Sequence, residues 1–153
     1  MLNKKYLFAV AAVTVLSTAS MVGCSNKNKS NEANGYVDGT YTKVATEEEN
    51  GYVYEATMVV EGGKITSIDW DAKDADGNSK KEAAENGTYV MTEDGLNWAE
   101  QSEALANCVI ENQSIDTIKT DENGKTDAVA GVSITVTNFV ELVKDCMDQA
   151  SAK

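Results

Sequence analysis

The first half of the chain shows the alternating hydrophobic pattern of β-strands. Alternation and a high content of β-branched and aromatic residues mark the segments 38–44, 52–60 and 64–70. Residues 61–64 (EGGK) predict a hairpin, because glycine accepts the positive φ that a tight turn needs. Strict alternation in 64–70 places Ile68 and Trp70 on one face and Ile65 on the opposite face. The first half therefore predicts an antiparallel meander.

The second half of the chain shows helical spacing instead. Apolar residues recur every three or four positions between 97 and 112, with Trp98 near the start. A second stripe forms a final helix, for which Thr135 is a suitable N-cap; it comprises Val136, Phe139, Val140, Val143, Met147 and Ala150. Shorter elements are a helix at 80–85, a strand at 115–119, and turns at 71–79, 86–87 and 121–124. The predicted fold class is α+β, an antiparallel hairpin-rich sheet packed against two longer helices in a single small domain.

The N-terminus has the features of an export signal. Lys4 and Lys5 precede an apolar run at 7–16, which is too short for a spanning helix. Gly23 before Cys24 is typical of a lipoprotein cleavage site, with Cys24 becoming the lipidated first residue. An ordinary secretory signal that contains a cysteine is the alternative. Both interpretations predict a signal peptide at 1–23 and an extracytoplasmic protein, which the lipid would anchor to the cell membrane.

Residues 24–36 predict a flexible polar tether, because they contain almost nothing apolar. The remaining residues, 37–152, form the single domain. The chain after the signal peptide carries eleven lysines against twenty-five acids, a net charge of −14. This charge argues against nucleic acid as a partner and against electrostatic binding to anionic headgroups. A generic acidic surface explains it as well as any steering role.

The chain contains no His, no Arg and no Pro. These absences exclude a Ser-His-Asp triad, a Cys-His dyad, a His-ligated metal and an arginine clamp for a free phosphate. The acidic turns at 71–77 and 121–124 have the wrong spacing for a calcium-binding EF-hand, so we predict no metal site and no catalytic residue. Such a protein performs no chemistry of its own or borrows it from a bound cofactor.

Two cysteines remain after Cys24. Cys108 and Cys146 both fall in helix-patterned segments, and Cys146 lies on the apolar stripe. An oxidising compartment permits a disulfide between them, but two separate buried thiols fit the pattern equally.

The segment from Asp127 to Thr135 (DAVAGVSIT) carries the most chemical information. It places Ser133 and Thr135 on a glycine-containing turn directly before the final helix. Unpaired backbone N–H groups at a helix start favour a phosphate. A structural turn that leads into a helix cap would produce a similar pattern.

This segment resembles the acceptor motif of the FMN-binding domain family, in which Asp, two residues, Ser/Thr, Gly, a small residue and Thr/Ser carry covalent FMN. Ser133 matches the acceptor, whereas Ala130 and Val132 depart from the usual Ser/Thr and Ala. The resemblance covers about residues 37–150, including DGTYT at 38–42 and VVEGGKITSI at 59–68. The chain is most similar to small FMN-carrying lipoproteins of extracellular electron transfer. The flavin subunits of sodium- or proton-coupled redox pumps, such as Na⁺-translocating NADH:quinone reductase, share the domain more distantly.

The resemblance implies that an exported flavin transferase attaches FMN to Ser133 through a phosphoester, with Thr135 as the backup acceptor. Asp127 would belong to the transferase recognition motif, and Gly131 would let the backbone approach the phosphate. The protein would then be an electron carrier rather than a self-sufficient enzyme. Its electron donor would be a membrane dehydrogenase or a quinone-linked partner, and its acceptor would be extracellular.

Two questions stay open at this stage. Trp98 and the tyrosines have the chemistry to flank a flavin ring, although regularly spaced aromatics more often belong to the core. The alternative function is a non-redox surface lipoprotein, a binding module whose FMN site has degenerated. Ala130 and Val132 favour that alternative.

Overall fold

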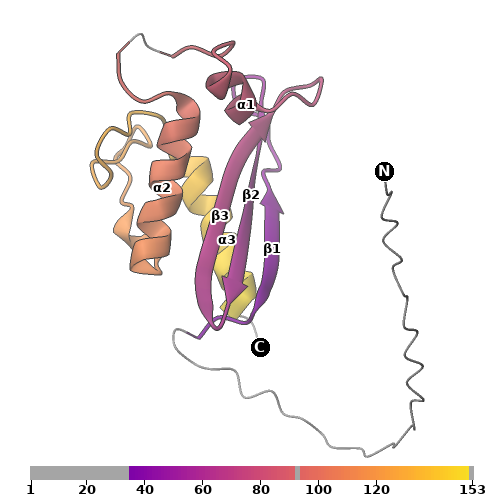
Figure 1. Ribbon diagram of the computed structural model, residues 1–153, viewed down its shortest axis with the longest axis vertical. Helices are drawn as coiled ribbons and strands as arrows, with labels where there is room; N and C mark the ends of the chain where they lie inside the picture. Colours follow the sequence, from indigo (N-terminus) through magenta and orange to yellow (C-terminus); the bar gives the residue numbers. More distant parts are fainter. Residues whose placement is uncertain (1–34, 92–93, 152–153) are drawn as a thin grey trace, which may run out of the picture.

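The computed structural model describes residues 35–91 and 94–151. Its sheet contains three antiparallel strands in the order β1 (Gly39–Val44), β2 (Val53–Glu61) and β3 (Lys64–Lys73), as the pattern predicted (Figure 1). Gly62 and Gly63 form the β2–β3 hairpin with φ of 60° and 76°. The predicted signal peptide at 1–23, the lipidation site Cys24 and nearly all of the tether lie outside the described residues. Tyr36, assigned to the tether, packs against the core.

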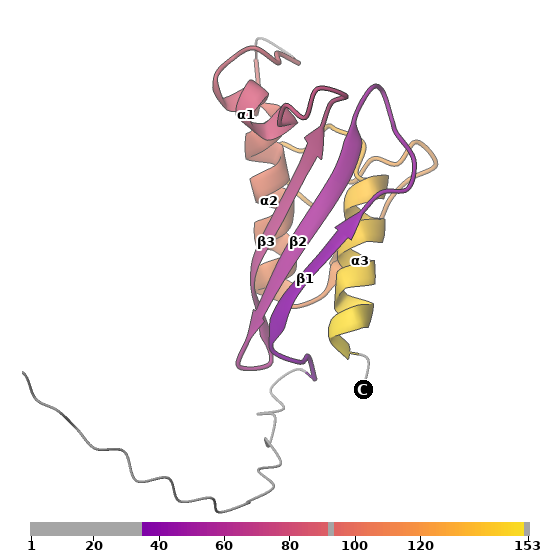
Figure 2. The same ribbon diagram turned by 90° about the vertical axis from the view of Figure 1, so that its right-hand side faces the viewer.

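Three helices and one short 3₁₀ helix complete the fold: α1 (Lys80–Glu85), α2 (Trp98–Asn112), η1 (Ile115–Thr117) and α3 (Thr137–Ser151). Helix α2 packs against β3, and α3 packs against β1 and β2, so both long helices cover one face of the sheet (Figure 2). The predicted α+β class, with a hairpin-rich sheet and two longer helices in a small domain, is confirmed.

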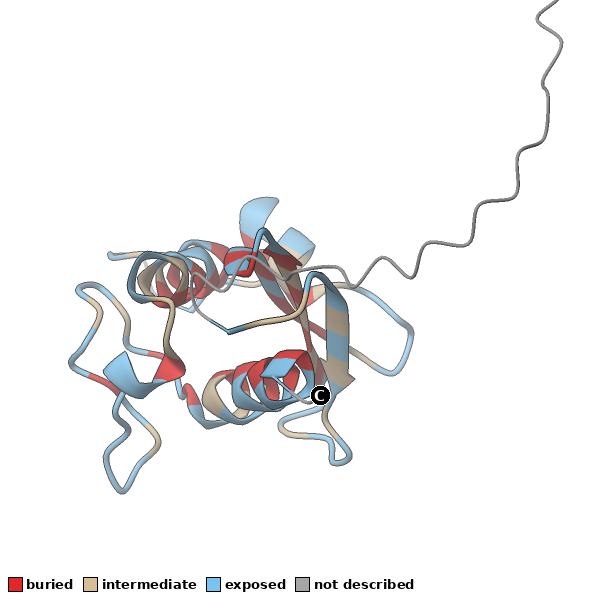
Figure 3. Cartoon of the chain, turned by 90° about the horizontal axis from the view of Figure 1, so that it is seen from below, coloured by how far each residue is buried: buried red, intermediate tan, exposed pale blue. Residues whose placement is uncertain are grey.

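The hydrophobic core fills the space between this face and the two helices (Figure 3). Its largest fully buried side chains include Trp70, Phe139 and Met58. The opposite face is polar. There Thr42 and Thr57 share a hydrogen bond, and Lys73 pairs with Glu55. Antiparallel sheets commonly bury one face and solvate the other in this way.

A β-bulge corrects the predicted orientation of Ile65. Val59 pairs with Ser67 while Val60 pairs with Ile65, so Thr66 is an extra residue in β3. The extra residue reverses the alternation, and Ile65 therefore faces the core together with Ile68 and Trp70.

Two local predictions were wrong. The strand expected at 115–119 is a 3₁₀ turn, because Ser114 Oγ accepts the Asp116 N–H and Ile118 N–H bonds back to Ile115 O. The final helix begins one residue later than expected. Val136, rather than Thr135, occupies the cap position, since the first helical bond runs from Val140 N to Val136 O.

The possible disulfide between Cys108 and Cys146 does not form, because the two thiols have separate environments. Cys146 Sγ points at the backbone carbonyls of Tyr41 and Ala56 beneath the sheet. Cys108 is half-buried beside Thr117. In residues 35–91 and 94–151, no helix is both long and apolar enough to cross a membrane.

Candidate functional site

The structure places Ser133 and Thr135 at a cavity of about 210 Å³ at one end of the sheet. We call it the acceptor cavity. It lies where β2 begins, beside the N-terminus of α2 and the segment that leads into α3. Its lining residues are Glu49, Asn50, Tyr54, Lys80, Tyr89, Met91, Trp98, Lys125, Ser133, Ile134 and Thr135.

The Ser133 hydroxyl is accessible. The residue is exposed, and within the described residues its Oγ makes no hydrogen bond. Thr135 is also exposed, whereas Ile134 between them is buried. The backbone therefore turns two hydroxyls outward and anchors the segment through an apolar side chain, an arrangement suited to modification of either hydroxyl.

Gln101 of α2 fixes the backbone of this segment. Its side chain is 1% exposed, and its Oε1 accepts hydrogen bonds from Ser133 N (2.7 Å) and Ile134 N (3.1 Å). Its Nε2 donates to Leu96 O at 2.8 Å. One buried amide thus ties the acceptor segment both to α2 and to the loop before it.

These bonds change the expected role of the backbone. The N–H groups of Ser133 and Ile134 already bond to Gln101, and Val136 N donates to Gly124 O. They are not the unpaired donors that the sequence suggested for a phosphate. The positive charge nearest the acceptor is instead Lys125, whose Nζ donates to Ser133 O.

Gly131 is required by local geometry. Its φ is +82°, and an added Cβ would lie 2.8 Å from Leu96 Cδ1. Leu96 therefore fills the space into which a side chain at position 131 would point. Val129 and Val132 close the turn, through a bond from Val132 N to Val129 O, and both pack against the core. Asp127 and Ala130 are exposed on the outer side of the turn.

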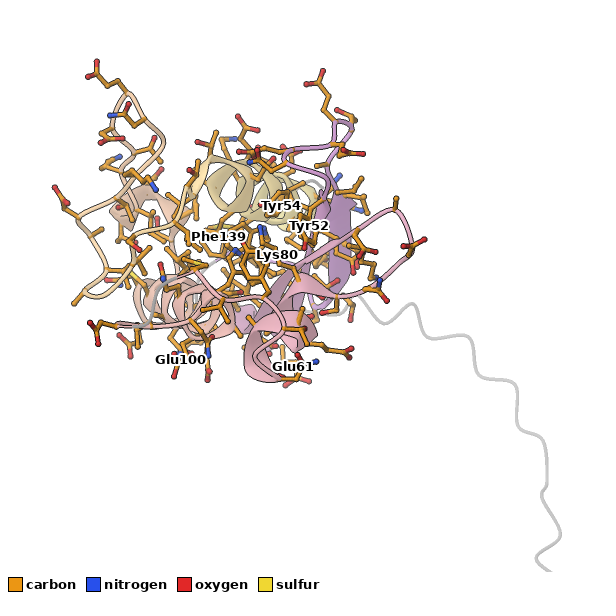
Figure 4. All side chains as sticks on the ribbon, turned by 90° about the horizontal axis from the view of Figure 1, so that it is seen from above. Tyr52, Tyr54, Glu61, Lys80, Glu100 and Phe139 are labelled. Atoms are coloured by element: carbon orange, nitrogen blue, oxygen red, sulfur yellow. The ribbon has the colours of Figure 1, made fainter. Side chains whose placement is uncertain are left out.

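Lys80 at the start of α1 is the most unusual residue of the site. It is 5% exposed, and its Nζ lies 4.5 to 5.3 Å from the ring centroids of Tyr52, Tyr54, Tyr89 and Trp98. Figure 4 shows Lys80 beside Tyr52 and Tyr54. The amine donates to Tyr54 Oη at 3.0 Å. In the described part of the chain, no carboxylate forms an ion pair with Lys80.

Burial shifts the protonation equilibria of this cluster. Desolvation lowers the pKa of Lys80, although the charges of Glu49 and Asp71 oppose the shift. Desolvation, reinforced by Glu49, raises the pKa of Tyr54 to about 12. The Tyr54 phenol is therefore neutral near pH 7, and the ammonium of Lys80 is held mainly by aromatic faces.

The chemistry of the donor set fits a group attached through its phosphate. Ser133 offers an exposed hydroxyl, and Lys125 supplies a cation beside it. Pockets that fully bury a drug-sized ligand measure about 300–1,000 Å³, so a cavity of about 210 Å³ would cover only part of a flavin. A phosphoester bond does not depend on full burial, and a partly exposed ring remains accessible to redox partners.

Trp98 belongs to the core, as its regular spacing suggested. It is 2% exposed, and its ring lies 4.9 Å from that of Trp70. One side of Trp98 nevertheless borders the acceptor cavity. The two acidic turns are ordinary turns: Asp74 Oδ1 accepts from Asp76 N and Asn78 N, and Asp121 Oδ1 accepts from Asn123 N and Lys125 N.

Sequence reasoning missed Gln101 and Lys80, although each left a signal. Gln101 lies on the apolar stripe of α2 between Trp98 and Leu105, where a polar residue needs an explanation. Lys80 is a cation in the first turn of a helix, where the dipole disfavours it. Neither signal indicates which distant residue is contacted.

Comparison with solved structures shows two similar proteins. A Clostridium thermocellum protein known from a solution NMR structure is 36% identical, with a TM-score of 0.56, over 75% of this chain and 92% of that protein. A Clostridium perfringens protein known from a crystal structure is 24% identical, with a TM-score of 0.56, over 75% of this chain and 88% of the other; it shows the fold alone. No family model matches the chain, and no curated protein matches it.

Proposed function

We propose that this chain, which belongs to the same family as the Clostridium thermocellum protein, is a membrane-anchored extracytoplasmic electron carrier that holds FMN covalently on Ser133. The observation that carries the proposal is the state of the Ser133 hydroxyl, which is exposed and has no hydrogen-bond partner among the described residues, on a backbone that Gln101 holds in place. The resemblance of residues 127–135 to a flavin acceptor motif supports the same assignment.

The resemblance implies attachment by an exported flavin transferase, and the absence of histidine from this chain fits a recipient that supplies no catalytic base of its own. In the transfer, Ser133 Oγ forms a bond to the FMN phosphorus of FAD. The pyrophosphate bond breaks, AMP leaves, and the transferase accepts the hydroxyl proton. An exposed turn gives the transferase access, and the bonds from Gln101 keep Ser133 in one geometry during the reaction.

The residues of this chain position the acceptor and moderate its charge. Lys125 lies beside Ser133 and partly neutralises a phosphate attached there. Thr135, exposed at the same cavity, is the backup acceptor. A bound flavin supplies one- or two-electron redox chemistry, and the protein supplies its orientation and surroundings.

The proposed route begins at a membrane dehydrogenase or a quinone-linked donor and ends at an extracellular acceptor. Lipid on Cys24 would hold the chain at the membrane. A polar tether of about a dozen residues would let the domain sample both partners. The strong negative charge of the chain suits attachment by lipid rather than by basic residues.

Peptide mapping by mass spectrometry tests the proposal. The full chain is purified from membranes of cells that contain the transferase, as wild type, Ser133→Ala and Thr135→Ala. We expect the mass of FMN less one water on the Ser133 peptide of the wild type and of Thr135→Ala, and no increment in Ser133→Ala. An increment retained in Ser133→Ala would move the site to Thr135, and an unmodified wild type would refute the covalent carrier.

The second candidate is a non-redox binding module with a degenerate FMN site. The small volume of the acceptor cavity favours it, as do Ala130 and Val132 in the motif. Such a module would be colourless and unmodified even in cells that contain the transferase, whereas the carrier would be yellow.

A further inference from the structure

We propose that Lys80 is the cationic contact for the ring system of a flavin in the acceptor cavity and favours its reduced form. This inference rests on the proposed function because it takes a flavin as the ligand. It concerns a part of the site that the acceptor motif does not include, since Lys80 lies in α1, far from Ser133 in sequence.

The position of Lys80 supports the assignment. Lys80 and Ser133 line the same cavity, whose volume of about 210 Å³ keeps opposite walls within reach of one planar ligand. A group attached to Ser133 that occupies this cavity would therefore share it with Lys80. Tyr54, Tyr89 and Trp98 also line the cavity, so a ligand there lies beside aromatic rings, although most of the lining surface is polar.

Lys80 has aromatic neighbours but no anionic partner among the described residues. An ammonium has three donors, and the Lys80 amine uses one of them on Tyr54 Oη. Its remaining contacts are aromatic ring faces, and no carboxylate pairs with it in residues 35–91 and 94–151. Buried charges are normally paired, so an unpaired one bordering a cavity points to a ligand.

The described residues that line the cavity carry a net positive charge and so produce a positive field there. Lys125 lies near Ser133, and Glu49 is the one acidic residue among the described lining residues; Asp71, outside the lining, also acts electrostatically on Lys80. Asn138 Nδ2 donates to Glu49 Oε2, which disperses part of that negative charge. Two lysines against one glutamate are notable in a chain whose overall net charge is −12.

The chemistry of reduction explains why this field would matter. Two electrons from the membrane donor, taken up with one proton, add one negative charge to a flavin ring. A nearby ammonium in a partly dehydrated site attracts that added charge more strongly than it attracts the oxidised ring. The effect of Lys80 would therefore be a higher reduction potential, with little effect on attachment to Ser133.

Redox titration of the flavinylated full chain provides the first test. Lys80→Met removes the charge, Lys80→Arg keeps it, and Lys81→Met is the matched control because Lys81 pairs with Asp69 outside the acceptor cavity. We expect Lys80→Met to weaken the preference for the reduced form about tenfold, a fall in potential of about 30 mV for a two-electron couple. Lys80→Arg and Lys81→Met should stay near the wild type. Equal potentials in all four proteins would overturn the inference.

A second measurement separates this inference from the proposed function. Unflavinylated full chain, from cells without the transferase, is titrated with oxidised and with reduced riboflavin, and binding is followed by quenching of protein fluorescence. We expect wild type to bind reduced riboflavin more tightly, and Lys80→Met to lose about tenfold of that preference. Lys80→Gln replaces Lys80→Met if the latter does not fold.

The two measurements give distinct outcomes. An unmodified Ser133 with a Lys80-dependent preference for reduced riboflavin would refute the covalent carrier and retain the role of Lys80. A modified Ser133 with no effect of Lys80→Met would support the covalent carrier and refute the role of Lys80. Absence of riboflavin binding in a chain that is also unmodified would overturn both.

Discussion

At each end of α2, a glutamine side chain forms hydrogen bonds with the backbone of a segment distant in sequence. At one end, which we call the acceptor end, Gln101 binds Ser133 N, Ile134 N and Leu96 O. At the other, the hairpin end, Gln113 Oε1 accepts from Ile65 N (2.8 Å) and its Nε2 donates to Ile65 O (2.9 Å). Gln101 thus holds the segment before α3, and Gln113 holds the start of β3.

The two ends differ in which groups the bound segment exposes to solvent. At the hairpin end, Gln113 holds a tight turn whose register the strands already determine. At the acceptor end, Gln101 holds a segment without regular structure and with two exposed hydroxyls beside a cavity. No strand or helix fixes the position of this segment, so the buried Gln101 amide does. We infer that the position of Ser133 matters for function.

The largest expected effect comes from Gln101→Leu. This change leaves three backbone groups near the acceptor without their partner, at about 1 kcal/mol each, so we expect unfolding free energy to fall by about 3 kcal/mol. Urea denaturation measures the loss. The same variant should also attach less FMN, because Ser133 is no longer held. Unchanged attachment at full folding would show that Gln101 is purely structural.

The matching change at the hairpin end is Gln113→Leu. Gln113 is half-buried, so water replaces part of what is lost, and we expect a loss of about 2 kcal/mol in the same denaturation assay. FMN attachment should equal that of the wild type. A decrease as large as that of Gln101→Leu would mean that attachment follows stability alone, and would remove the distinction between the two ends.

Two glycines allow a finer comparison. Gly131→Ala and Gly62→Ala both place a side chain at positive φ, but only at Gly131 does the new Cβ approach another atom, Leu96 Cδ1 at 2.8 Å. We expect Gly62→Ala to cost about 1 kcal/mol and Gly131→Ala to cost more, about 2 kcal/mol. Adding Leu96→Ala to Gly131→Ala should not restore full stability, because the φ strain remains. Equal thermal shifts for the two single variants would contradict the Leu96 contact.

The smallest expected effect concerns the turn before the acceptor. Backbone hydrogen bonds, first from Lys125 N, lower the pKa of Asp121. A carboxyl with a lowered folded pKa stabilises the fold above its unfolded pKa, about 3.9, and this contribution is lost as pH falls through the folded pKa. Asp121→Asn should therefore lower the urea midpoint slightly at pH 7. A difference from wild type that persisted below both pKa values would contradict this linkage.

The sequence predicted most of the fold because its periodicities were regular. The strands, the hairpin, α1, α2 and α3 all follow from alternation, helical spacing and turn residues. Ile65 was misplaced because the bulge at Thr66 is set by pairing with β2, which a single segment does not contain. The 115–119 segment alternates like a strand, but the part of the chain that the structure describes offers it no strand to pair with, and Ser114 closes a turn instead.

The site was predicted only in part for a related reason. The motif identified Ser133 and Thr135 as exposed hydroxyls because it is local in sequence. Gln101 and Lys80 contribute through contacts with residues 26 to 33 positions away, which no spacing rule specifies. The aromatic surroundings of Lys80 depend on three separate segments meeting at one end of the sheet.

One hydrogen bond also determines how the domain can be handled. Val37 N donates to Ala150 O at 2.9 Å, so the chain enters the domain beside the last turn of α3 (Figure 2). Ser133 lies before the first turn of the same helix, about 22 Å away along its axis at 1.5 Å per residue. A bead, electrode or fluorescent protein coupled at Val37 or Ser151 would therefore lie at the end of α3 remote from Ser133, and would leave the acceptor accessible to a partner that approaches from the other side.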